Sequence, residues 1–463
     1  MAELDYDSIK NPEDVLKVVK DNDVTFINLW FPNVLGQLRN VNIPKGVLGE
    51  ALEEGIGFDG SSIEGFVRIE ESDLIARPIE SSLRILPYRQ QDKDKSVSMF
   101  AKIYNPDGSR FEGDSLYVLE RQLDKMKKMG FDNFYIGPEL EFFLFKDNNP
   151  ENLPEKILDK GGYFGLADDK GQPIRRDVML ACENMGIETE ASHHEVAPSQ
   201  HEIALKYDSA INMAMKAMTY RRLVKEIAMK HGVYATFLPK PLYGENGSGM
   251  HIHQSLFKEG KNAFFNLEDE HHLSKDAKSY VAGILRHAPE FVAITNQWVN
   301  SYQRLVPNFE APTELSWARR NRSTAIRVPM YKPKKEKASR IETRFPDPAC
   351  NIPLAFAVML AVGLEGIKNK YELPFPIEEN IYEMEEGDRR ARGVYSLPGN
   401  LRDATELMET SGLVRGVLGE HIHTILVENQ KIQWKKYHRE VRGKDIEDHI
   451  VTDYELGKLF PLV

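Results

Sequence analysis

Asn246-Gly247-Ser248-Gly249-Met250-His251-Ile252-His253-Gln254-Ser255 is the most informative stretch of this chain: a glycine-containing loop that runs directly into a short strand. Successive side chains of an extended strand point to opposite faces, so His251, His253 and Ser255 share one face, with Met250 and Ile252 behind them. Two histidines and a hydroxyl beside bare backbone amides are typical of a site for a metal and a phosphate group. Taken alone, the pattern also fits a polar strand face that lies against water.

A second predicted strand, residues 134–145, places two glutamates at alternate positions. Glu139 and Glu141 share one face, and the other face is apolar, with Ile136, Leu140, Phe142 and Leu144. Two glutamates at this spacing are close enough to share ions, and they repel each other when no ion is present. The alternative interpretation is a plain solvated face.

A third segment, residues 195–202, reads Glu-Val-Ala-Pro-Ser-Gln-His-Glu and has the features of a hairpin. If Pro198 and Ser199 form a two-residue turn, Glu195 lies directly opposite Glu202. Like charges in that position are destabilising unless something neutralises them. A longer loop would loosen this pairing.

A fourth segment, residues 340–344, places Arg340, Glu342 and Arg344 on one strand face, which by itself also fits a salt-bridge ladder. Together the segments supply six candidate metal ligands: Glu139, Glu141, Glu195, Glu202, His251 and Glu342. Two divalent cations would offset four of the five negative charges, and the oxygen-rich set favours Mg²⁺ or Mn²⁺. Metal-assisted phosphoryl transfer also needs arginines. Those available are Arg304, Arg319, Arg320, Arg322, Arg327, Arg340 and Arg344.

The composition is that of an ordinary globular protein, with 41% hydrophobic and 28% charged residues. The net charge of −11 argues against a nucleic-acid or anionic-membrane partner. Cys182 and Cys350 are too few for a disulfide framework, and we expect both to be buried. The first residues lack the pattern of a signal peptide, and the longest apolar run, residues 352–364, is too short to span a bilayer. We therefore expect a cytoplasmic protein in which residues 352–364 form a buried helix.

A length of 463 residues suggests two or three domains, at about 150 residues per domain. Residues 11–14, Asn-Pro-Glu-Asp, are typical of a capped helix start, and residues 24–30 read as a strand. We place a domain boundary near residue 110, after a β-rich first part. Beyond it, we predict one helix from about Asp114 to Gly130 and another over residues 212–231.

The order of several motifs along nearly the whole chain resembles that of one enzyme family. These motifs are Phe58-Asp59-Gly60-Ser61-Ser62, Gly137-Pro138-Glu139-Leu140-Glu141, His193-His194-Glu195, and residues 246–255, 304–312, 319–327 and 340–348. The chain resembles a bacterial or archaeal type I glutamine synthetase. The resemblance implies an α+β fold, with a small β-grasp-like N-terminal domain over residues 1–110. Residues 111–463 then form a catalytic domain with a curved antiparallel sheet and surrounding helices.

The resemblance implies that ATP drives the ligation of ammonia to glutamate through γ-glutamyl phosphate, with two Mg²⁺ or Mn²⁺ ions in each active site. One metal is then held by Glu141, Glu195 and Glu202, and the other by Glu139, His251 and Glu342. The family assembles two stacked hexameric rings, a dodecamer with each active site between neighbouring subunits. Asp59 is accordingly expected to act as the catalytic base in the adjacent protomer's site.

The remaining site residues are also assigned by resemblance. Arg322 and Arg344 lie near the transferred phosphoryl group, and the nucleotide is surrounded by Glu190, Tyr207, His253, Ser255, Arg327, Lys337 and Arg340. The glutamate substrate contacts Asn246, Gly247 and Arg304. An ammonium pocket is formed by Ser62, Tyr163, Glu195 and Glu310 together with Asp59. Glu310 lies in a loop that resembles the family's flap, whose closure keeps water from the acyl phosphate.

The resemblance to type I glutamine synthetases implies one of two patterns of regulation. Members controlled by adenylylation carry an extra segment before the region of residues 161–164, and this chain lacks it, although Tyr382 resembles the modified tyrosine. Residues 63–71 instead resemble the subclass that glutamine inhibits directly, in which the arginine matching Arg68 takes part. We expect direct regulation. A nitrogen-regulatory protein partner is compatible with it.

Two other functions remain open. A γ-glutamyl-amine ligase on the same scaffold would replace the ammonium pocket with room for a larger amine, and the retained Asp59, Ser62, Tyr163 and Glu310 favour ammonia. A non-catalytic structural or regulatory relative need not keep its metal ligands, and this chain has the full set.

Overall fold

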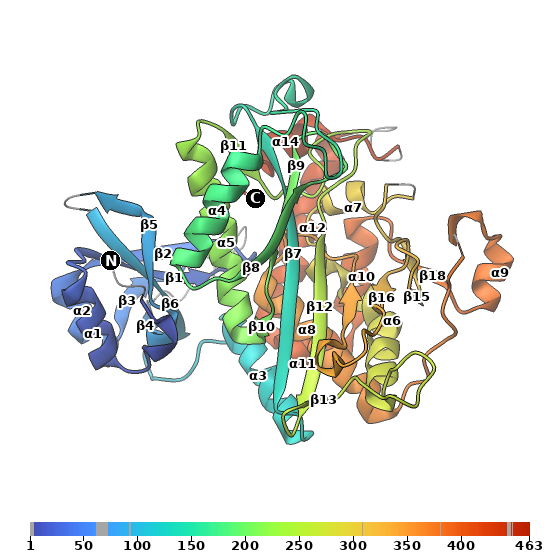
Figure 1. The fold of residues 1–463 in the computed structure, drawn as a ribbon, viewed down its shortest axis with the longest axis horizontal. Helices are drawn as coiled ribbons and strands as arrows, with labels where there is room; N and C mark the ends of the chain where they lie inside the picture. Colours follow the sequence, from blue (N-terminus) through green and yellow to red (C-terminus); the bar gives the residue numbers. More distant parts are fainter. Residues whose placement is uncertain are drawn as a thin grey trace.

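The structure is a computed structural model that describes residues 4–61, 73–91, 94–307, 309–379, 381–441, 446 and 448–463. Two β-sheets stand beside each other, a small one in the N-terminal part and a long one in the rest of the chain (Figure 1). Helices pack mainly against the long sheet. The α+β fold class predicted from the sequence is confirmed.

The N-terminal sheet has the strand order β2-β1-β6-β4-β3, and β5 pairs with β6. Strands β1 and β6 are parallel and the other pairs are antiparallel. Helix α1 begins as its sequence predicts, because Asn11 and Asp14 form a capping box around Pro12. The elements are α1 (Pro12–Asp21), β1 (Phe26–Pro32), β2 (Leu38–Pro44), α2 (Leu48–Glu53), β3 (Ile56–Asp59), β4 (Asp73–Pro78), β5 (Arg84–Gln91) and β6 (Asp94–Tyr104).

The long sheet has the order β15-β16-β17-β12-β7-β9-β8, with β10 and β11 paired to β7 and β13 paired to β12. Its strands are β7 (Asn133–Phe145), β8 (Thr189–His194), β9 (Gln200–Leu205), β10 (Asp208–Ser209), β11 (Tyr234–Thr236), β12 (Met250–Lys258), β13 (Lys261–Asn262), β15 (Trp317–Ala318), β16 (Ile326–Arg327) and β17 (Ile341–Thr343). All pairs are antiparallel except β15 with β16. Strands β14 (Glu314–Leu315) and β18 (Tyr395–Ser396) form a separate pair.

Helices cover the apolar face of the long sheet. The helices that follow the N-terminal sheet in the described chain, not all of which contact the long sheet, are α3 (Ser115–Lys128), α4 (Gln172–Asn184), α5 (Ala210–Lys230), α6 (Lys275–Thr295), α7 (Ser301–Arg304), α8 (Ile352–Asn369), α9 (Glu386–Ala391), α10 (Leu401–Thr410), α11 (Gly412–Leu418), α12 (Glu420–Glu440) and α14 (Asp453–Lys458). Asp114 caps α3, which ends just before Gly130, as predicted. The predicted helix over residues 212–231 is α5.

Helix α8 is the predicted buried helix, and it continues beyond the apolar run to Asn369. Within the described ranges it is the helix that is long and apolar enough to cross a membrane, but 78% of it is buried inside the protein. It packs tightly against α6: a Cβ on Gly283 would lie 2.3 Å from the main-chain oxygen of Val362. Its apolar residues therefore form the protein core.

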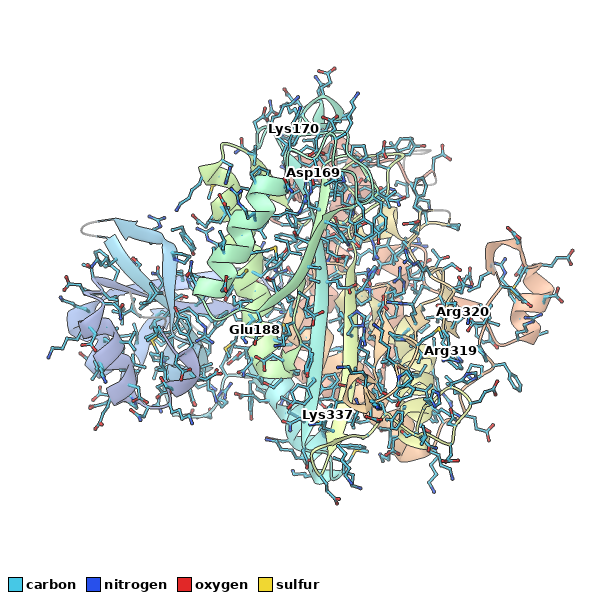
Figure 2. The ribbon with its side chains drawn as sticks, in the orientation of Figure 1. Asp169, Lys170, Glu188, Arg319, Arg320 and Lys337 are labelled. Carbon is cyan, nitrogen blue, oxygen red and sulfur yellow. The ribbon has the colours of Figure 1, made fainter. Side chains whose placement is uncertain are left out.

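Beyond the outer strand β15, the chain turns away from the long sheet. Arg319 and Arg320 directly follow β15 (Figure 2). Their main-chain amides donate to the two carboxylate oxygens of Glu378. Figure 2 also places Lys337 toward the β13 end of the sheet and Asp169 toward the opposite end.

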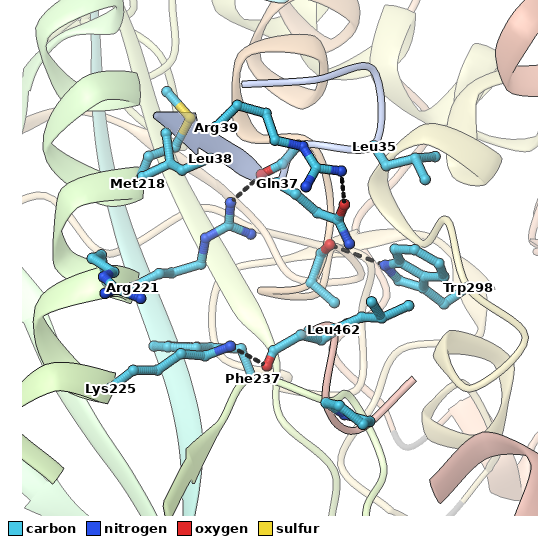
Figure 3. A pocket seen from close by; sticks show the side chains of 15 residues that line it. Leu35, Gln37, Leu38, Arg39, Met218, Arg221, Lys225, Phe237, Trp298 and Leu462 are labelled. Atoms are coloured by element: carbon cyan, nitrogen blue, oxygen red, sulfur yellow. Dashed lines mark hydrogen bonds between the residues drawn. The ribbon is translucent and has the colours of Figure 1, made fainter. Parts of the chain in front are cut away.

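The turn between β1 and β2 attaches the N-terminal sheet to the rest of the protein. Gly36 has a φ of +75°, and a Cβ there would lie 2.5 Å from the Cα of Asn351, so the turn requires glycine. Arg221 of α5 donates to the main-chain oxygen of Gly36 at 2.8 Å, and Lys225 lies one helical turn further along (Figure 3).

Candidate active site

Three neighbouring strands bring the first group of predicted ligands together. His251 of β12 lies opposite Glu139 of β7, and His253 lies opposite Glu342 of β17. His251 Nδ1 is 3.3 Å from a carboxylate oxygen of Glu139 and 3.9 Å from one of Glu342. The ligand atoms of Glu139, His251 and Glu342 all lie within 4.8 Å of one another, an arrangement suited to a single cation.

The β8–β9 hairpin carries a second cluster, and its predicted register is wrong. Glu202 lies opposite His193, not Glu195. Pro198 and Ser199 do form the turn, since the amide of Gln200 donates to the main-chain oxygen of Ala197 at 3.1 Å and Ser199 takes a φ of +60°. The amide of Glu195 nevertheless donates to the main-chain oxygen of Gln200, so the loop between the paired strands is the longer one that was left open. His193 lies 3.4 Å from Glu195 and 3.7 Å from Glu202, measured from ring nitrogen to carboxylate oxygen. His193, Glu195 and Glu202 thus form a cluster of three ligand atoms within 4.8 Å.

Glu141 lies between the two clusters. It pairs with Glu202 across β7 and β9, and one of its oxygens is 4.0 Å from His251 Nε2. Its other oxygen accepts from the amide of Gly249 at 2.8 Å and from Gln200 Nε2 at 2.9 Å. The Gly249 amide is one of the bare backbone groups of the glycine-containing loop.

The acidic groups differ sharply in how well they are neutralised. Burial, and then repulsion from Glu141, raises the pKa of Glu195 to about 8. Burial and the charges of Glu139, Glu141 and Glu195 likewise raise the pKa of Glu202 well above its ordinary value. Burial would also raise the pKa of Glu342, but His253, Arg344, His251 and Arg327 outweigh it and lower the pKa to about 2. The hairpin side of the site is therefore short of positive charge.

These donor groups fit divalent cations. Carboxylate oxygens dominate, one imidazole joins each cluster, and the acids of the second cluster repel one another in a buried setting. Hard cations such as Mg²⁺ or Mn²⁺ prefer this kind of ligand set. A cation between Glu195 and Glu202 would remove the repulsion that raises their pKa values.

A cavity of about 460 Å³ opens beside both clusters. Every predicted substrate residue of the described chain except Asp59 lines it: Glu141, Tyr163, Glu195, Asn246, Gly247, Arg304, Glu310, Arg322 and Arg344. Arg304 is buried, and its guanidinium donates to the main-chain oxygens of Arg344, Phe345 and Pro346. Arg344 donates to a carboxylate oxygen of Glu342 at 2.6 Å. The cavity therefore combines an acidic wall with an arginine wall.

A second cavity, of about 250 Å³, lies on the other side of Glu139, which lines both. All but one of the predicted nucleotide residues line it: Glu190, Tyr207, His253, Ser255, Lys337 and Arg340. Arg340 Nε donates to His253 Nδ1 at 3.2 Å, and the other ring nitrogen of His253 is 3.0 Å from Glu139. Arg327 lines the first cavity instead and donates to Glu342 at 2.5 Å.

Among the predicted site residues that the structure describes, Asp59 lines neither cavity. Asp59 ends β3 on the N-terminal sheet, is exposed, and accepts a bond from the amide of Ser61 at 2.9 Å. Ser62 and Arg68 lie outside the described residues, as does the side chain of Tyr382.

Comparison with known proteins decides the family. The model of the glutamine synthetase β-grasp domain matches residues 23–106, and that of the glutamine synthetase catalytic domain matches residues 112–449. The chain belongs to the glutamine synthetase family. The resemblance to type I glutamine synthetases predicted from the motifs is confirmed.

Relatives match over nearly their whole length. The chain is 46% identical over 443 residues to the glutamine synthetase of Thermus thermophilus, covering 95% of this chain and 98% of that protein. It is 47% identical over 443 residues to that of Mycolicibacterium smegmatis, covering 95% and 99%. The solved glutamine synthetase of Plasmodium falciparum aligns with a TM-score of 0.84 at 25% identity, covering 96% of this chain and 99% of that one.

This member of the glutamine synthetase family carries a third cluster behind the hairpin. His194 Nε2 lies 2.8 Å from Asp159, and Arg175 lies 2.8 Å from His201 Nδ1 and also pairs with Asp169. Asp159, His194 and His201 resemble a metal site in spacing. Because an arginine can only donate, His201 Nδ1 is an acceptor and its proton lies on Nε2, which leaves that ring no lone pair for a metal. We therefore assign this cluster a structural role.

His193 and Gln200 are the site residues that sequence reasoning missed. His193 precedes Glu195 by two positions, so strand alternation alone places both side chains on one face. The sequence could therefore have predicted that His193 lies in the site. Gln200, by contrast, reaches Glu141 from 59 positions away, and nothing in its local sequence indicates this bond.

Proposed function

We propose that this protein catalyses the ATP-dependent ligation of ammonia to L-glutamate, giving L-glutamine, ADP and phosphate through γ-glutamyl phosphate. The observation that carries the proposal is the shared wall between two cavities. Glu139 stands between a cavity lined by basic and aromatic groups and a cavity lined by acids and arginines. A nucleotide in the first would present its terminal phosphate to a substrate in the second.

In this proposal the smaller cavity holds the nucleotide. His253, Ser255, Lys337 and Arg340 supply hydrogen-bond donors for phosphate and ribose oxygens, and Tyr207 and Glu190 also line this cavity. Arg327 donates to Glu342 and lines the substrate cavity, so we assign it to the phosphate end of the nucleotide.

Two divalent cations, Mg²⁺ or Mn²⁺, are held by the acidic residues. We assign Glu139, His251 and Glu342 to one ion, and Glu141, Glu195 and Glu202 to the other, with His193 close to the second set. When bound, such cations withdraw charge from phosphate oxygens and favour attack at phosphorus.

The glutamate carboxylate then attacks the terminal phosphate to form the acyl phosphate. Asn246, Gly247 and Arg304 orient the amino acid, and Arg322 and Arg344 offset the charge that develops on the transferred group. Since Arg304 is committed to main-chain oxygens, we infer that it shapes the pocket and contributes its charge more than it forms a new bidentate contact.

Ammonium must lose a proton before it can attack. We propose that Asp59 of a neighbouring protomer accepts it, because Asp59 is exposed on the N-terminal sheet and does not line either cavity of its own chain. Ser62, Tyr163, Glu195 and Glu310 complete the cation pocket. This arrangement requires an oligomer, and we propose a dodecamer of two hexameric rings.

The remaining proposals follow the family. We propose a division into residues 1–110 and 111–463, a cytoplasmic location, direct inhibition by glutamine involving Arg68, and a nitrogen-regulatory protein as partner.

The test is an assay of phosphate release from ATP. We expect release to require both glutamate and ammonium and to match glutamine formation one for one. Methylamine and ethylamine in place of ammonium are the controls. Faster turnover with either amine would assign the protein to the γ-glutamyl-amine ligases, and no turnover with any acceptor would refute the proposed function.

A further inference from the structure

Lys240 is a buried lysine outside the proposed chemistry. Its side chain is 2% exposed, and it forms no salt bridge with a carboxylate in the part of the chain that the structure describes. Burying a charge is costly, and the charge of Glu245 offsets that cost only in part. Lys240 does not line the substrate cavity, so its ammonium group serves another purpose.

The main chain of Lys240 is fixed to the protein core. Its amide donates to the side-chain oxygen of Asn300 at 2.7 Å, and Asn300 Nδ2 donates back to the Lys240 oxygen at 2.9 Å. The same Asn300 group reaches Glu455 at 2.8 Å, and Glu455 belongs to the capping box of α14. The backbone of Lys240 is therefore held in a fixed position in the protein interior.

The ammonium group contacts two separate loops. It donates to the main-chain oxygen of Glu245, one residue before Asn246, and it lies 3.9 Å from the centre of the Phe309 ring. Phe309 directly precedes Glu310. A cation over an aromatic face is attracted by the ring quadrupole, most strongly where water is excluded.

The same two loops meet again at the mouth of the cavity. Asn246 Nδ2 donates to Glu310 Oε2 at 3.4 Å, and both residues line the cavity. Glu310 is exposed and has a φ of +54°, a conformation that a non-glycine residue holds only when its surroundings impose it. Burial lowers the pKa of Lys240 to about 8, which leaves the ammonium group largely charged at neutral pH.

We propose that Lys240 is a positioning residue that ties the Glu245–Gly247 and Phe309–Ala311 loops together and so holds Glu310 over the substrate cavity. The inference rests on the proposed function. Its consequence is that Lys240 and Phe309 keep water away from the acyl phosphate until ammonia arrives, although neither needs to touch a reacting atom.

The test uses the full-length assembled enzyme and four variants. Lys240→Met keeps most of the side-chain length and removes the charge, and Phe309→Leu keeps an apolar group and removes the ring. Phe309→Tyr is the matched control because it retains the ring face. The double variant Lys240→Met/Phe309→Leu reports whether the two residues act together.

The main readout is the ratio of phosphate released without ammonium to glutamine formed with it. We expect Lys240→Met and Phe309→Leu each to raise this ratio about tenfold, as expected from losing a desolvated cation–π contact. We expect the double variant to match the single variants, and Phe309→Tyr to match the parent. Hydrogen exchange of the peptide that contains Phe309 and Glu310 should accelerate in the same variants.

The outcomes separate this inference from the proposed function. If the parent enzyme forms no glutamine, the proposed function fails, and hydrogen exchange still tests the contact between Lys240 and the loop. If the parent forms glutamine but Phe309→Leu leaves both the ratio and the exchange unchanged, the inference is overturned. Additive effects in the double variant would also overturn it, because they would show two independent roles.

Discussion

The β8–β9 hairpin has two faces built from alternate residues of the same strands, and they balance their charges in opposite ways. On the front face, His193, Glu195 and Glu202 gather beside Glu139 and Glu141, and burial with mutual repulsion raises the pKa values of Glu195 and Glu202. On the back face, His194 bonds to Asp159 and His201 to Arg175, which also pairs with Asp169.

The difference separates a structural cluster from a site prepared for a ligand. The charges of the back face pair with partners from the same chain, Arg175 with Asp169 and His194 with Asp159. Within the described residues, the buried Nε2 of His201 has no hydrogen-bond partner. The front face gathers more buried acids than the protein's own groups can neutralise, and this raises the pKa values of Glu195 and Glu202. Because Glu202 directly follows His201, the paired back face also fixes the backbone that presents the front-face ligand.

The largest effect is expected for Glu202→Gln on the front face. Turnover should fall by about 10³-fold, because Glu202 is a proposed ligand of the second cation, and that cation offsets charge on the transferred phosphoryl group. The metal-free protein should nevertheless melt at a higher temperature than the parent, because one repelling acid has been removed. Differential scanning fluorimetry and the glutamine assay measure the two quantities.

Glu188→Gln is the control for Glu202→Gln. Glu188 is exposed and pairs with Lys206 at the surface, so its loss should change stability by less than about 0.5 kcal/mol. A metal-free Glu202→Gln variant that melts below the parent would contradict the uncompensated front face.

On the back face, Arg175→Met should be destabilising. Removing one partner of a buried pair typically costs about 3–5 kcal/mol, and here Asp169 and His201 both lose their donor. Activity per folded molecule should fall by about 10–100-fold, as for other groups that orient metal ligands. Urea unfolding and the glutamine assay check both values.

Arg176→Met is the natural comparison, since this neighbouring arginine is largely exposed and contacts Asp177 at 3.5 Å. Its effect on stability should be negligible. Equal destabilisation by the two substitutions would show that the back-face network contributes nothing specific.

Adding divalent cations should stabilise the protein through the front face of the hairpin and not through the back face. Adding Mg²⁺ or Mn²⁺ at about 100 times its dissociation constant stabilises a protein by about 2.7 kcal/mol, so the metal-free parent should melt several degrees higher once either ion is added. The gain should be much smaller in Glu202→Gln and unchanged in Glu188→Gln. An equal gain in Glu202→Gln would mean that the cations bind elsewhere.

Local sequence predicted much of the fold and of the candidate site, and it could not predict the contacts between distant residues. Strand alternation placed His251 with His253 and Glu139 with Glu141, and caps at Asn11 and Asp114 fixed two helix starts. The pairing of Glu195 with Glu202 was wrong because the amide of Glu195 donates to the main-chain oxygen of Gln200, which adds Val196 and Ala197 to the loop before the turn. The back face was missed entirely, since Asp159 and His194 are 35 positions apart. Nor does any periodicity indicate that Arg304 is held by main-chain oxygens.

The smallest expected effect concerns a buried charge away from the front face, at Lys225 of α5, whose ammonium group donates to the main-chain oxygen of Val463 at 2.6 Å. Burial, with repulsion from Arg221 and Arg222, lowers the pKa of Lys225 to about 7 from its ordinary 10.5. Between these values the unfolded chain binds more protons than the folded one, so stability rises as pH increases from about 7 to 10.5. Below pH 7 both states are protonated, and the charged lysine is most costly there. Lys225→Met should therefore melt a few degrees above the parent at pH 7, and the difference should shrink toward pH 10. A difference in melting temperature that grows with pH would contradict this prediction. It would show that the bond from Lys225 to the main-chain oxygen of Val463 outweighs the cost of burying the charge.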